Sequence, residues 1–378
     1  KKKICYWAPF IDNVATIKAV YNSVKSINKY SNNIYEGNIV DVFGEWKNEN
    51  YFQLKNINFI ELNNIPFLLK FSSKGFFNSR LKYVLVFLFS FFPLKKYILK
   101  DKPEYLIAHL VTSLPIFINF FFKIQTKIIL RISGKPKLNL IRYIFWKIFL
   151  KKIYKITFPT KETLTYFQSL NIVNSNKLEL LYDPILEVRK INEKFKDKNL
   201  FEFNDKKFFL AIGRLTKQKN FIFLIKCFKK IIKTNNSVNL LIIGSGEDYN
   251  KLKNFIVKNK LDKNIFLIGY KENVFKYLKI CEAFILSSLW EDPGFVIIEA
   301  MYSNRIVISS DCPSGPKEIV GDKNGIIFKS NSINDFINKF SIYLKLSPQE
   351  KKRIILNSKK SLKKFTLFSH YKKLKTIL

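Results

Sequence analysis

The chain has 378 residues, of which 47% are hydrophobic and 25% are charged, and its formal net charge at pH 7 is +37. This length accommodates two domains of ordinary size, and the apolar content excludes a disordered chain. The four cysteines are widely spaced and the chain has only two histidines, which argues against both a disulfide framework and a structural zinc site. We therefore expect a folded cytoplasmic protein with reduced thiols.

The first half of the chain alternates between strand-like and helix-like segments. Short apolar runs predict strands, and apolar residues that recur every three or four positions predict helices. The expected strands cover residues 1–7, 38–43, 105–109, 127–132 and 156–159, and the expected helices cover residues 15–29 and a segment from residue 161. Residues 187–205 are largely charged and polar, which indicates a linker.

Most of the excess positive charge of this half lies in one stretch. Residues 74–161 hold 18 basic and 2 acidic residues, a net charge of +16, whereas residues 1–73 have a net charge of only +3. Seven of the 66 basic residues are arginine, which indicates an A+T-rich genome, but codon bias does not account for the uneven distribution. The phosphates of a nucleic acid or of a membrane would attract such a stretch.

The longest apolar run of the chain lies inside this basic stretch. It covers residues 83–94 and is shorter than the roughly 18–20 residues that span a bilayer. Two basic residues flank it on each side, a pattern typical of a helix in the membrane interface; a buried helix of a large core is the alternative. With residues 76–99, 117–127 and 140–152 as contact segments, we expect the stretch 74–161 to bind an anionic membrane surface.

The second half continues the alternation with shorter connections. The expected strands cover residues 208–212, 239–243, 265–268, 283–286 and 306–309, and the expected helices cover residues 220–234, 248–260, 274–280, 294–302 and the lysine-rich tail from residue 348. Strands alternating with helices predict an α/β fold of two doubly wound, Rossmann-like domains that face each other across a cleft. We place these domains at residues 1–183 and 184–355, with a helix at 356–378 that crosses back to the first.

The strongest chemical signal is the segment 287–301, which reads SSLWEDPGFVIIEAM. A turn with Pro293 and Gly294 follows a predicted strand and precedes a predicted helix. The first N–H groups of a helix lack intrahelical partners and its dipole favours an anion, while glycine permits close approach of a ligand. Glu291 and Glu299 flank this turn, which suits a ligand with hydroxyl groups on both sides of a diphosphate. Alternatively, Glu291 caps the helix and Glu299 is an ordinary surface residue.

A second signal is the turn GRLTKQKN at residues 213–220, between a predicted strand and a predicted helix. Arg214 and Lys219 supply two cations, which would neutralise the charge that a nucleoside diphosphate gains as its glycosidic bond breaks. A site without such cations needs a metal ion instead, and no DxD-type carboxylate pair occurs beside the motif. We therefore expect a metal-independent site. A solvated turn without function is the alternative.

Together, the two segments resemble the family-4 retaining glycosyltransferases of GT-B fold, whose motif is a glutamate, seven residues and a second glutamate. The resemblance covers most of residues 208–328. It implies that Glu291 contacts the transferred sugar as a catalytic residue and that Glu299 binds the ribose. The implied diphosphate contacts are Arg214, Lys219, Gly294, Phe295 and Val296. Asn220 stands where the family usually has a glycine.

The resemblance implies further contacts with less specific motifs. Tyr270 and Lys271 match the turn whose backbone meets the base, and residues 313–319 are similar to members that build lipid-linked glycans. In the first half, His109 ends a strand where the family often has a histidine near the transferred sugar; a structural histidine is the alternative. The expected acceptor-side residues are Asp12, Arg131 and Ser133. The opening loop, residues 8–15, lacks the family's usual paired glycines.

The resemblance implies a retaining transfer of a sugar from a nucleoside diphosphate, with UDP favoured, to a hydroxyl of a lipid-linked saccharide or other glycan in bacterial surface polysaccharide assembly. No cofactor or metal is expected besides this donor, and the expected location is the inner face of the cytoplasmic membrane. A GT-B sugar-nucleotide epimerase or phosphorylase is one alternative. A nucleic-acid-binding protein is another, although the chain has no helix-turn-helix, zinc-finger or RNP motif.

Overall fold

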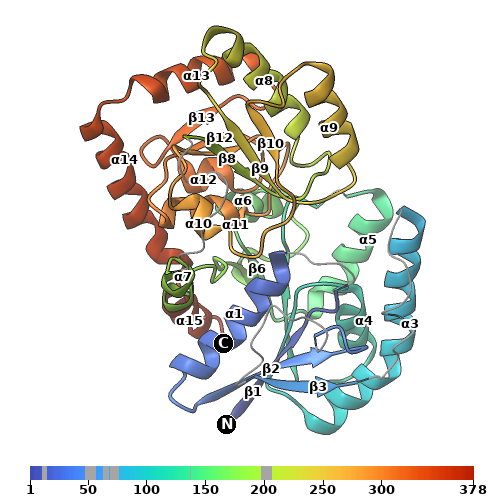
Figure 1. The fold of residues 1–378 in the computed structure, drawn as a ribbon. Helices are drawn as coiled ribbons and strands as arrows, with labels where there is room; N and C mark the ends of the chain where they lie inside the picture. The colour runs from blue at the N-terminus through green and yellow to red at the C-terminus, as the bar shows by residue number, and fades with distance from the viewer. Residues whose placement is uncertain (11–14, 47–56, 63–67, 69–75, 137, 197–206) are drawn as a thin grey trace. The chain divides into compact units, whose positions relative to one another are not determined.

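The computed structural model describes residues 1–10, 15–46, 57–62, 68, 76–136, 138–196 and 207–378, with only the backbone at 76–79 (Figure 1). The chain forms two compact units. Unit 1 contains residues 1–185 and 367–378, and unit 2 contains residues 186–366. The chain thus leaves the first unit two residues later than expected from the sequence, and returns to it at residue 367 rather than 356.

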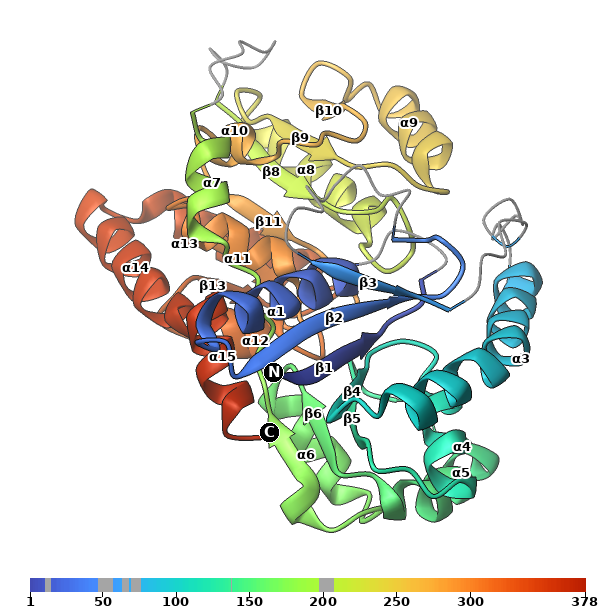
Figure 2. The same cartoon turned by 90° about the horizontal axis from the view of Figure 1, so that it is seen from below.

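Unit 1 is built on a parallel sheet in which seven described strands follow the order β3-β2-β1-β4-β5-β6-β7 (Figure 2). The strands are β1 (Lys2–Trp7), β2 (Tyr35–Asp41), β3 (Asn58–Glu61), β4 (Tyr105–Ala108), β5 (Lys127–Arg131), β6 (Lys155–Phe158) and β7 (Leu178–Leu180). The central strands are apolar on both faces because helices cover both sides of a parallel sheet. All five strands expected from the sequence of this half are present.

Side chains of β1 alternate between the two faces of this sheet. Ile4 and Tyr6 belong to one buried cluster, and Cys5 and Trp7 belong to the other. The first cluster packs under α1 (Ala15–Tyr30) and α15 (Leu367–Lys375), and the second packs under α3 (Phe76–Asp101), α4 (Ser113–Phe121), α5 (Leu140–Phe149) and α6 (Lys161–Ser169). The apolar run 83–94 is therefore part of a 26-residue helix, α3, which buries Val86, Leu94 and Ile98.

Unit 2 is built on a second parallel sheet, in which six described strands follow the order β10-β9-β8-β11-β12-β13. The strands are β8 (Phe209–Ile212), β9 (Leu240–Ile243), β10 (Ile265–Leu267), β11 (Phe284–Leu286), β12 (Val307–Ser310) and β13 (Ile326–Phe328). The chain first builds outward from β8 to β10 and then continues on the other side of β8 with β11. The point between β8 and β11 is therefore the topological switch point, where ligands of such sheets bind.

The described helices of unit 2 include the four expected between strands and the start of the expected tail helix, whereas the helices at residues 188–194, 316–320 and 333–345 were not expected. In chain order, the described helices are α7 (Val188–Lys194), α8 (Phe221–Thr234), α9 (Tyr249–Lys258), α10 (Phe275–Leu278), α11 (Phe295–Tyr302), α12 (Pro316–Val320), α13 (Ile333–Lys345) and α14 (Pro348–Ser361). The prediction of a linker at residues 187–205 was wrong for α7. This helix buries Ile191 and is held by a 3.1 Å hydrogen bond from the Tyr302 hydroxyl to Asn192. Residues 197–205 lie outside the described ranges.

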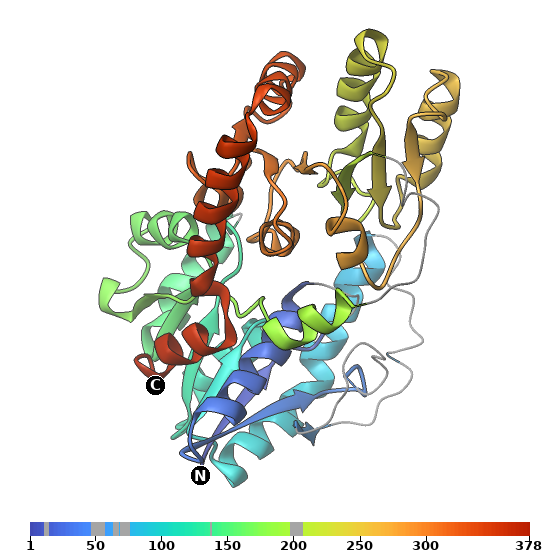
Figure 3. The same cartoon turned by 60° about the vertical axis from the view of Figure 1, so that its left-hand side comes forward.

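The last helix belongs to the first unit. The chain passes from α14 through a short 3₁₀ segment, Leu362–Phe365, into α15 (Figure 3). Tyr371 and Leu374 of α15 join the buried cluster under α1, and Lys373 donates a 2.8 Å hydrogen bond to Glu179. The segment 367–378 thus completes a core that starts at β1.

We predict that Leu374→Ala lowers the free energy of unfolding of unit 1 by about 2–5 kcal/mol, because Leu374 is fully buried and its loss leaves a cavity. Urea unfolding followed by tryptophan fluorescence measures this, because Trp7, Trp46 and Trp146 lie in unit 1. The exposed Lys372→Ala is the control on the same helix. Equal unfolding midpoints for the two variants would contradict the packing described for α15.

Candidate functional site

The two sequence motifs of the second half meet at the switch point of unit 2. One is the turn that follows β8, and the other is the turn that follows β11. The Gln218 side chain donates to the Trp290 carbonyl at 2.9 Å, and the Leu289 amide donates to the Gln218 carbonyl at 2.8 Å. The Ser287 hydroxyl donates to the Lys219 carbonyl at 2.8 Å. The parallel strands place these turns at the same edge of the sheet, and the hydrogen bonds fix them together.

At the centre of these turns, Lys219 and Glu291 form an ion pair. Lys219 Nζ lies 2.5 Å from Glu291 Oε1, and the side chains are only 13% and 5% exposed. The hydroxyl of Ser288 donates to the same carboxylate oxygen at 2.5 Å. The alternative in which Glu291 caps the helix does not fit this geometry, because Gly294 is the N-cap of α11 and the Glu291 carboxylate is bonded to Lys219 and Ser288.

Helix α11 begins directly beside this ion pair. Gly294 has φ 95°, a left-handed conformation that favours glycine. A Cβ atom on Gly315 would lie 2.3 Å from the Pro293 carbonyl oxygen, so only glycine lets the following loop pack against this turn. The Glu291 amide also donates to the Pro313 carbonyl at 3.1 Å. The loop 313–319 therefore supports the turn that presents Glu291 and the start of α11.

Val296 and Glu299 lie on the more exposed face of α11. They are three residues apart and half-buried, whereas Ile297, Ile298 and Ala300 are buried. Residues with this spacing share one face of a helix. The backbone N–H groups of Phe295 and Val296, in the first turn, have no intrahelical acceptor. The expected ribose contact and three of the five expected diphosphate contacts thus lie at the start or on the exposed face of one short helix.

The turn after β8 carries the two predicted cations in different surroundings. Arg214 is exposed and forms no ion pair with any described residue, whereas Lys219 is nearly buried. Asn220, which replaces the family's glycine, has φ 52° and is the N-cap of α8. Asparagine is one of the few residues that adopt this left-handed conformation readily. The substitution therefore keeps the backbone geometry of the turn.

The expected base-binding residues lie on a neighbouring turn. Tyr270 and Lys271 follow β10 and are exposed. The preceding Gly269 has φ 71°, and its carbonyl accepts a 2.9 Å hydrogen bond from the Gly244 amide in the turn after β9. A backbone hydrogen bond thus joins the turns after β9 and β10, and several hydrogen bonds join the turns after β8 and β11.

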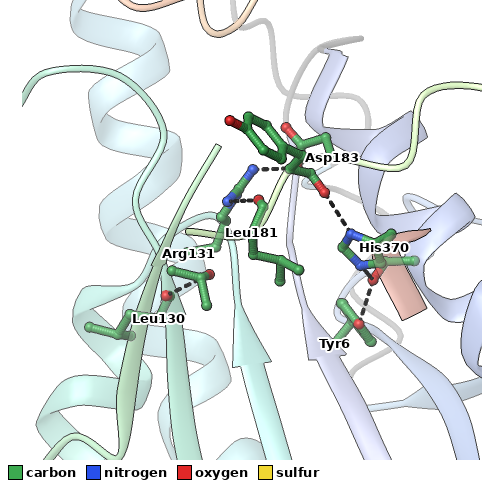
Figure 4. Close-up of polar contacts among 9 residues, drawn as sticks. Tyr6, Leu130, Arg131, Leu181, Asp183 and His370 are labelled. Atoms are coloured by element: carbon green, nitrogen blue, oxygen red, sulfur yellow. Dashed lines mark hydrogen bonds and ion pairs between the residues drawn. The ribbon is translucent and has the colours of Figure 1, made fainter. Parts of the chain in front are cut away.

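Unit 1 places the other predicted residues differently. Asp12 lies outside the described residues, and Ser133 is exposed after β5. Arg131 is buried: it forms an ion pair with Asp183 and donates to the Leu181 carbonyl at 2.8 Å (Figure 4). The sequence predicts that Arg131 faces an acceptor, but the structure places its guanidinium inside the unit, where its positive charge is already paired.

His109 is half-buried and lies close to the buried Arg131. The two residues line one small cavity of unit 1 with Tyr6, Asp183 and His370. Burial, followed by the charge of Arg131 and the proximity of His370, holds the pKa of His109 well below its usual range. The imidazole of His109 is therefore uncharged at neutral pH. One of its ring nitrogens can donate a hydrogen bond to a hydroxyl group, and the other can accept one.

Sequence reasoning missed His370, which connects α15 to this part of unit 1. Its Nδ1 lies 2.7 Å from the Tyr182 carbonyl oxygen, and its Nε2 lies 2.6 Å from the Ser23 hydroxyl (Figure 4). A carbonyl only accepts, so Nδ1 carries the proton and Nε2 accepts from Ser23. Ser23 in turn accepts from the Tyr6 hydroxyl at 2.6 Å. A histidine in a lysine-rich tail gives no sequence signal of this network.

The described residues offer no group of three or more His, Cys, Asp or Glu side chains that could hold a metal ion. Metal independence remains a prediction. All four cysteines are free and buried. Burial raises the pKa of Cys312, beside the Lys219–Glu291 pair, to about 12. This thiol therefore stays protonated and acts as a packing residue.

Part of the chain matches a known family. Residues 192–361 match the model of the family described as glycosyl transferases group 1. An uncharacterized glycosyltransferase of Methanocaldococcus jannaschii is 34% identical over 266 residues, which are 65% of this chain and 65% of that protein. The N-acetylgalactosamine-N,N'-diacetylbacillosaminyl-diphospho-undecaprenol 4-alpha-N-acetylgalactosaminyltransferase of Campylobacter jejuni is 32% identical over 151 residues, 40% of this chain and 39% of that enzyme. The chain thus spans less than two thirds of the length of these curated relatives.

Solved structures resemble the whole chain at low identity. A glycosyltransferase of Rickettsia africae has a TM-score of 0.76 at 16% identity and covers 100% of this chain and 97% of its own. A point mutant of TarM from S. aureus, in complex with UDP and other ligands, has a TM-score of 0.74 at 16% identity, with 100% and 99% coverage. At such identities these structures establish the fold and nothing more.

The His370 network predicts a loss of stability in acid. Burial, with Arg131 nearby, lowers the pKa of His370 to about 4 from its ordinary 6.5, although the Tyr182 carbonyl acts in the opposite direction. Between these values the unfolded chain binds a proton that the folded chain does not. Stability therefore falls as the pH falls from 6.5 towards 4, by about 1.4 kcal/mol per pH unit for this group.

This contribution is measurable with His370→Gln, which removes the titrating group. We expect the difference in unfolding free energy between wild type and variant to shrink as the pH is lowered through this window, in urea titrations followed by tryptophan fluorescence. Parallel pH profiles for the two proteins would contradict the prediction. Ser23→Ala is the control, since it removes one hydrogen bond and leaves the imidazole in place.

Proposed function

We propose that the chain transfers a sugar from a nucleoside diphosphate sugar to a hydroxyl group. Two findings support this proposal: residues 192–361 match the model of the glycosyl transferases group 1 family, and the fold resembles that of solved glycosyltransferases. The observation that carries the proposal is the buried Lys219–Glu291 pair beside the first turn of α11. A cation, a helix N-terminus and a carboxylate together suit a ligand that joins a diphosphate to a sugar.

Each side of the donor then has its own contact. The diphosphate lies against Arg214, Lys219 and the backbone N–H groups at the start of α11, near Gly294, Phe295 and Val296. Glu299, on the exposed face of α11, accepts hydrogen bonds from the ribose, and Glu291 accepts them from hydroxyls of the transferred sugar. Tyr270 and Lys271 lie beside the base. UDP is the proposed nucleotide. This choice is supported by the similar fold of TarM, whose structure contains UDP.

The proposed reaction retains the anomeric configuration. The bond between the anomeric carbon and the diphosphate oxygen breaks, and the acceptor oxygen bonds to the same face of that carbon. The departing diphosphate oxygen takes the acceptor's proton, so no protein nucleophile is needed. Arg214, Lys219 and the helix N-terminus stabilise the negative charge that develops on the leaving group, which is the task that a metal ion performs in other sites. Neutral His109 is the proposed partner of a sugar hydroxyl.

The proposed acceptor is a lipid-linked saccharide at the inner face of the cytoplasmic membrane. The C. jejuni relative is named for an undecaprenyl-diphosphate-linked substrate. Helix α3 exposes apolar side chains at four-residue spacing, namely Val84 (52%), Leu88 (60%) and Phe92 (73%). Helix α5 exposes Leu140, Ile141, Ile144 and Ile148 in the same manner. Among the described residues, no helix is both long enough and apolar enough to cross a membrane.

These exposed stripes lie within the basic stretch. Helix α4 contacts both α3 and α5, and the three helices lie side by side in Figure 1. Lys95 and Lys96 continue along α3 beyond Phe92, and Lys147 lies on α5. An exposed apolar face bordered by lysines is the pattern of a helix that rests on an anionic bilayer.

We predict that Lys219→Ala lowers sugar transfer at least about 100-fold, the usual cost of one electrostatic contact to a transition state. Glu299→Ala should lower kcat/KM by about 10- to 100-fold, because it removes a charged acceptor of ribose hydrogen bonds. The assay combines UDP-, GDP- and ADP-sugars with lipid-linked acceptors and follows the products by mass spectrometry. Lys217→Ala, an exposed lysine in the same turn, is the matched control. Full activity of either variant would refute the site. Sugar-nucleotide conversion without an acceptor, or a requirement for phosphate, would indicate an epimerase or a phosphorylase.

A second prediction concerns the membrane. The double variant Leu88→Asp/Phe92→Asp should bind anionic vesicles at least about tenfold more weakly than wild type, since it removes two apolar side chains from the contact. Wild-type binding should also weaken with salt. Val257→Asp, an equally exposed apolar position on α9 of unit 2, is the control. Sedimentation that is the same with neutral and anionic vesicles would contradict the membrane proposal.

A further inference from the structure

We infer that Ser288 is a positioning residue that holds the Glu291 carboxylate in place when the donor's diphosphate draws Lys219 away. The inference rests on the proposed function and assigns a role to a residue of the same site. Ser288 lies two residues after the end of β11 and is fully buried.

The contacts of Glu291 fall on one of its two oxygens. Lys219 Nζ and Ser288 Oγ both lie 2.5 Å from Oε1. No described residue donates to Oε2. The carboxylate is thus held through one oxygen, and the other oxygen remains available to a sugar hydroxyl. A carboxylate held by two donors on one side keeps a single orientation for such a contact.

The backbone carbonyl of Ser288 is also held by a hydrogen bond. The hydroxyl of Ser310, on β12, donates to the Ser288 carbonyl at 2.7 Å, and both serines are fully buried. The Glu291 amide is tied to the Pro313 carbonyl. Ser288 and Glu291 are therefore anchored by their backbones, and the hydrogen bond between their side chains is supported by a rigid turn.

The two donors to Glu291 respond differently to a diphosphate. Lys219 is a cation, and the negative charge of a diphosphate competes with Glu291 for its ammonium group. Ser288 is neutral and buried at the strand end, so the diphosphate does not attract it. Once the donor is bound, Ser288 remains as the donor that keeps Glu291 oriented. Its effect should therefore appear in sugar recognition and transfer, and not in binding of the nucleoside diphosphate alone.

The functional test compares Ser288→Ala with Ser309→Ala. Ser309 is a fully buried serine of β12 whose hydroxyl donates only to the neighbouring Ser310 carbonyl, so it reports the general cost of removing a buried hydroxyl. We expect Ser288→Ala to lower kcat by about 10- to 100-fold, the effect of one hydrogen bond to a charged group. UDP binding by calorimetry should stay within about twofold of wild type, and Ser288→Thr should restore most of kcat.

Two outcomes of this test would overturn the inference. One is a kcat of Ser288→Ala equal to that of Ser309→Ala. The other is an equal loss of UDP binding and of transfer, which would make Ser288 a structural residue of the whole turn.

A second test does not depend on activity. Lys219→Met keeps the apolar part of the side chain but removes the ammonium group. The variant therefore mimics the state in which the ammonium group no longer contacts Glu291. In crystal structures, Glu291 should keep its position in Lys219→Met and lose it in the double variant Lys219→Met/Ser288→Ala. An unchanged Glu291 in the double variant would overturn the inference. If the wild type transfers no sugar, the proposed function fails, but this comparison still decides whether Ser288 positions Glu291.

Discussion

The site in unit 2 depends on one ion pair between two turns that are far apart in the sequence. Lys219 and Glu291 are 72 residues apart and nearly buried, and their contact joins the end of β8 to the end of β11. A buried charge without a partner is strongly destabilising. Each residue therefore requires the other, and a ligand that separates them must supply replacement contacts. The Lys219 ammonium group and the Glu291 carboxylate thus contribute both to substrate recognition and to the local stability of the turns.

The parallel topology explains why these turns meet. In unit 2 the strand order reverses between β8 and β11, so two connections that start at adjacent strand ends diverge to opposite sides. The space between them is where Lys219 and Glu291 lie. Left-handed backbone at Gly294 and Asn220 then starts α11 and α8 at that edge. The strand order thus determines where the two turns meet, and the side chains on those turns determine which ligand the site can bind.

The sequence predicted elements and motifs well, because both are local. Hydrophobic periodicity located five of the six described strands of unit 2 within one or two residues and missed β13. The eight-residue spacing of Glu291 and Glu299 marked the start and the exposed face of α11. Contacts between distant segments were not predictable. Nothing near Arg131 reveals that Asp183 neutralises it, and nothing near His370 reveals Ser23 or Tyr182. Helix α7 was missed because the segment is largely charged and polar, and because the Tyr302 hydroxyl that donates to Asn192 is more than a hundred positions away.

The return of α15 to unit 1 has a consequence for biosynthesis. Residues 1–185 leave the ribosome before residues 186–366, but the core beneath β1 lacks Tyr371 and Leu374 until the segment 367–378 has been translated. Unit 2, which is contiguous in the chain, is completely synthesised before that point. The domain that is made first is therefore completed last, and its unfinished apolar face is exposed to chaperones for the whole time that the second domain takes to emerge.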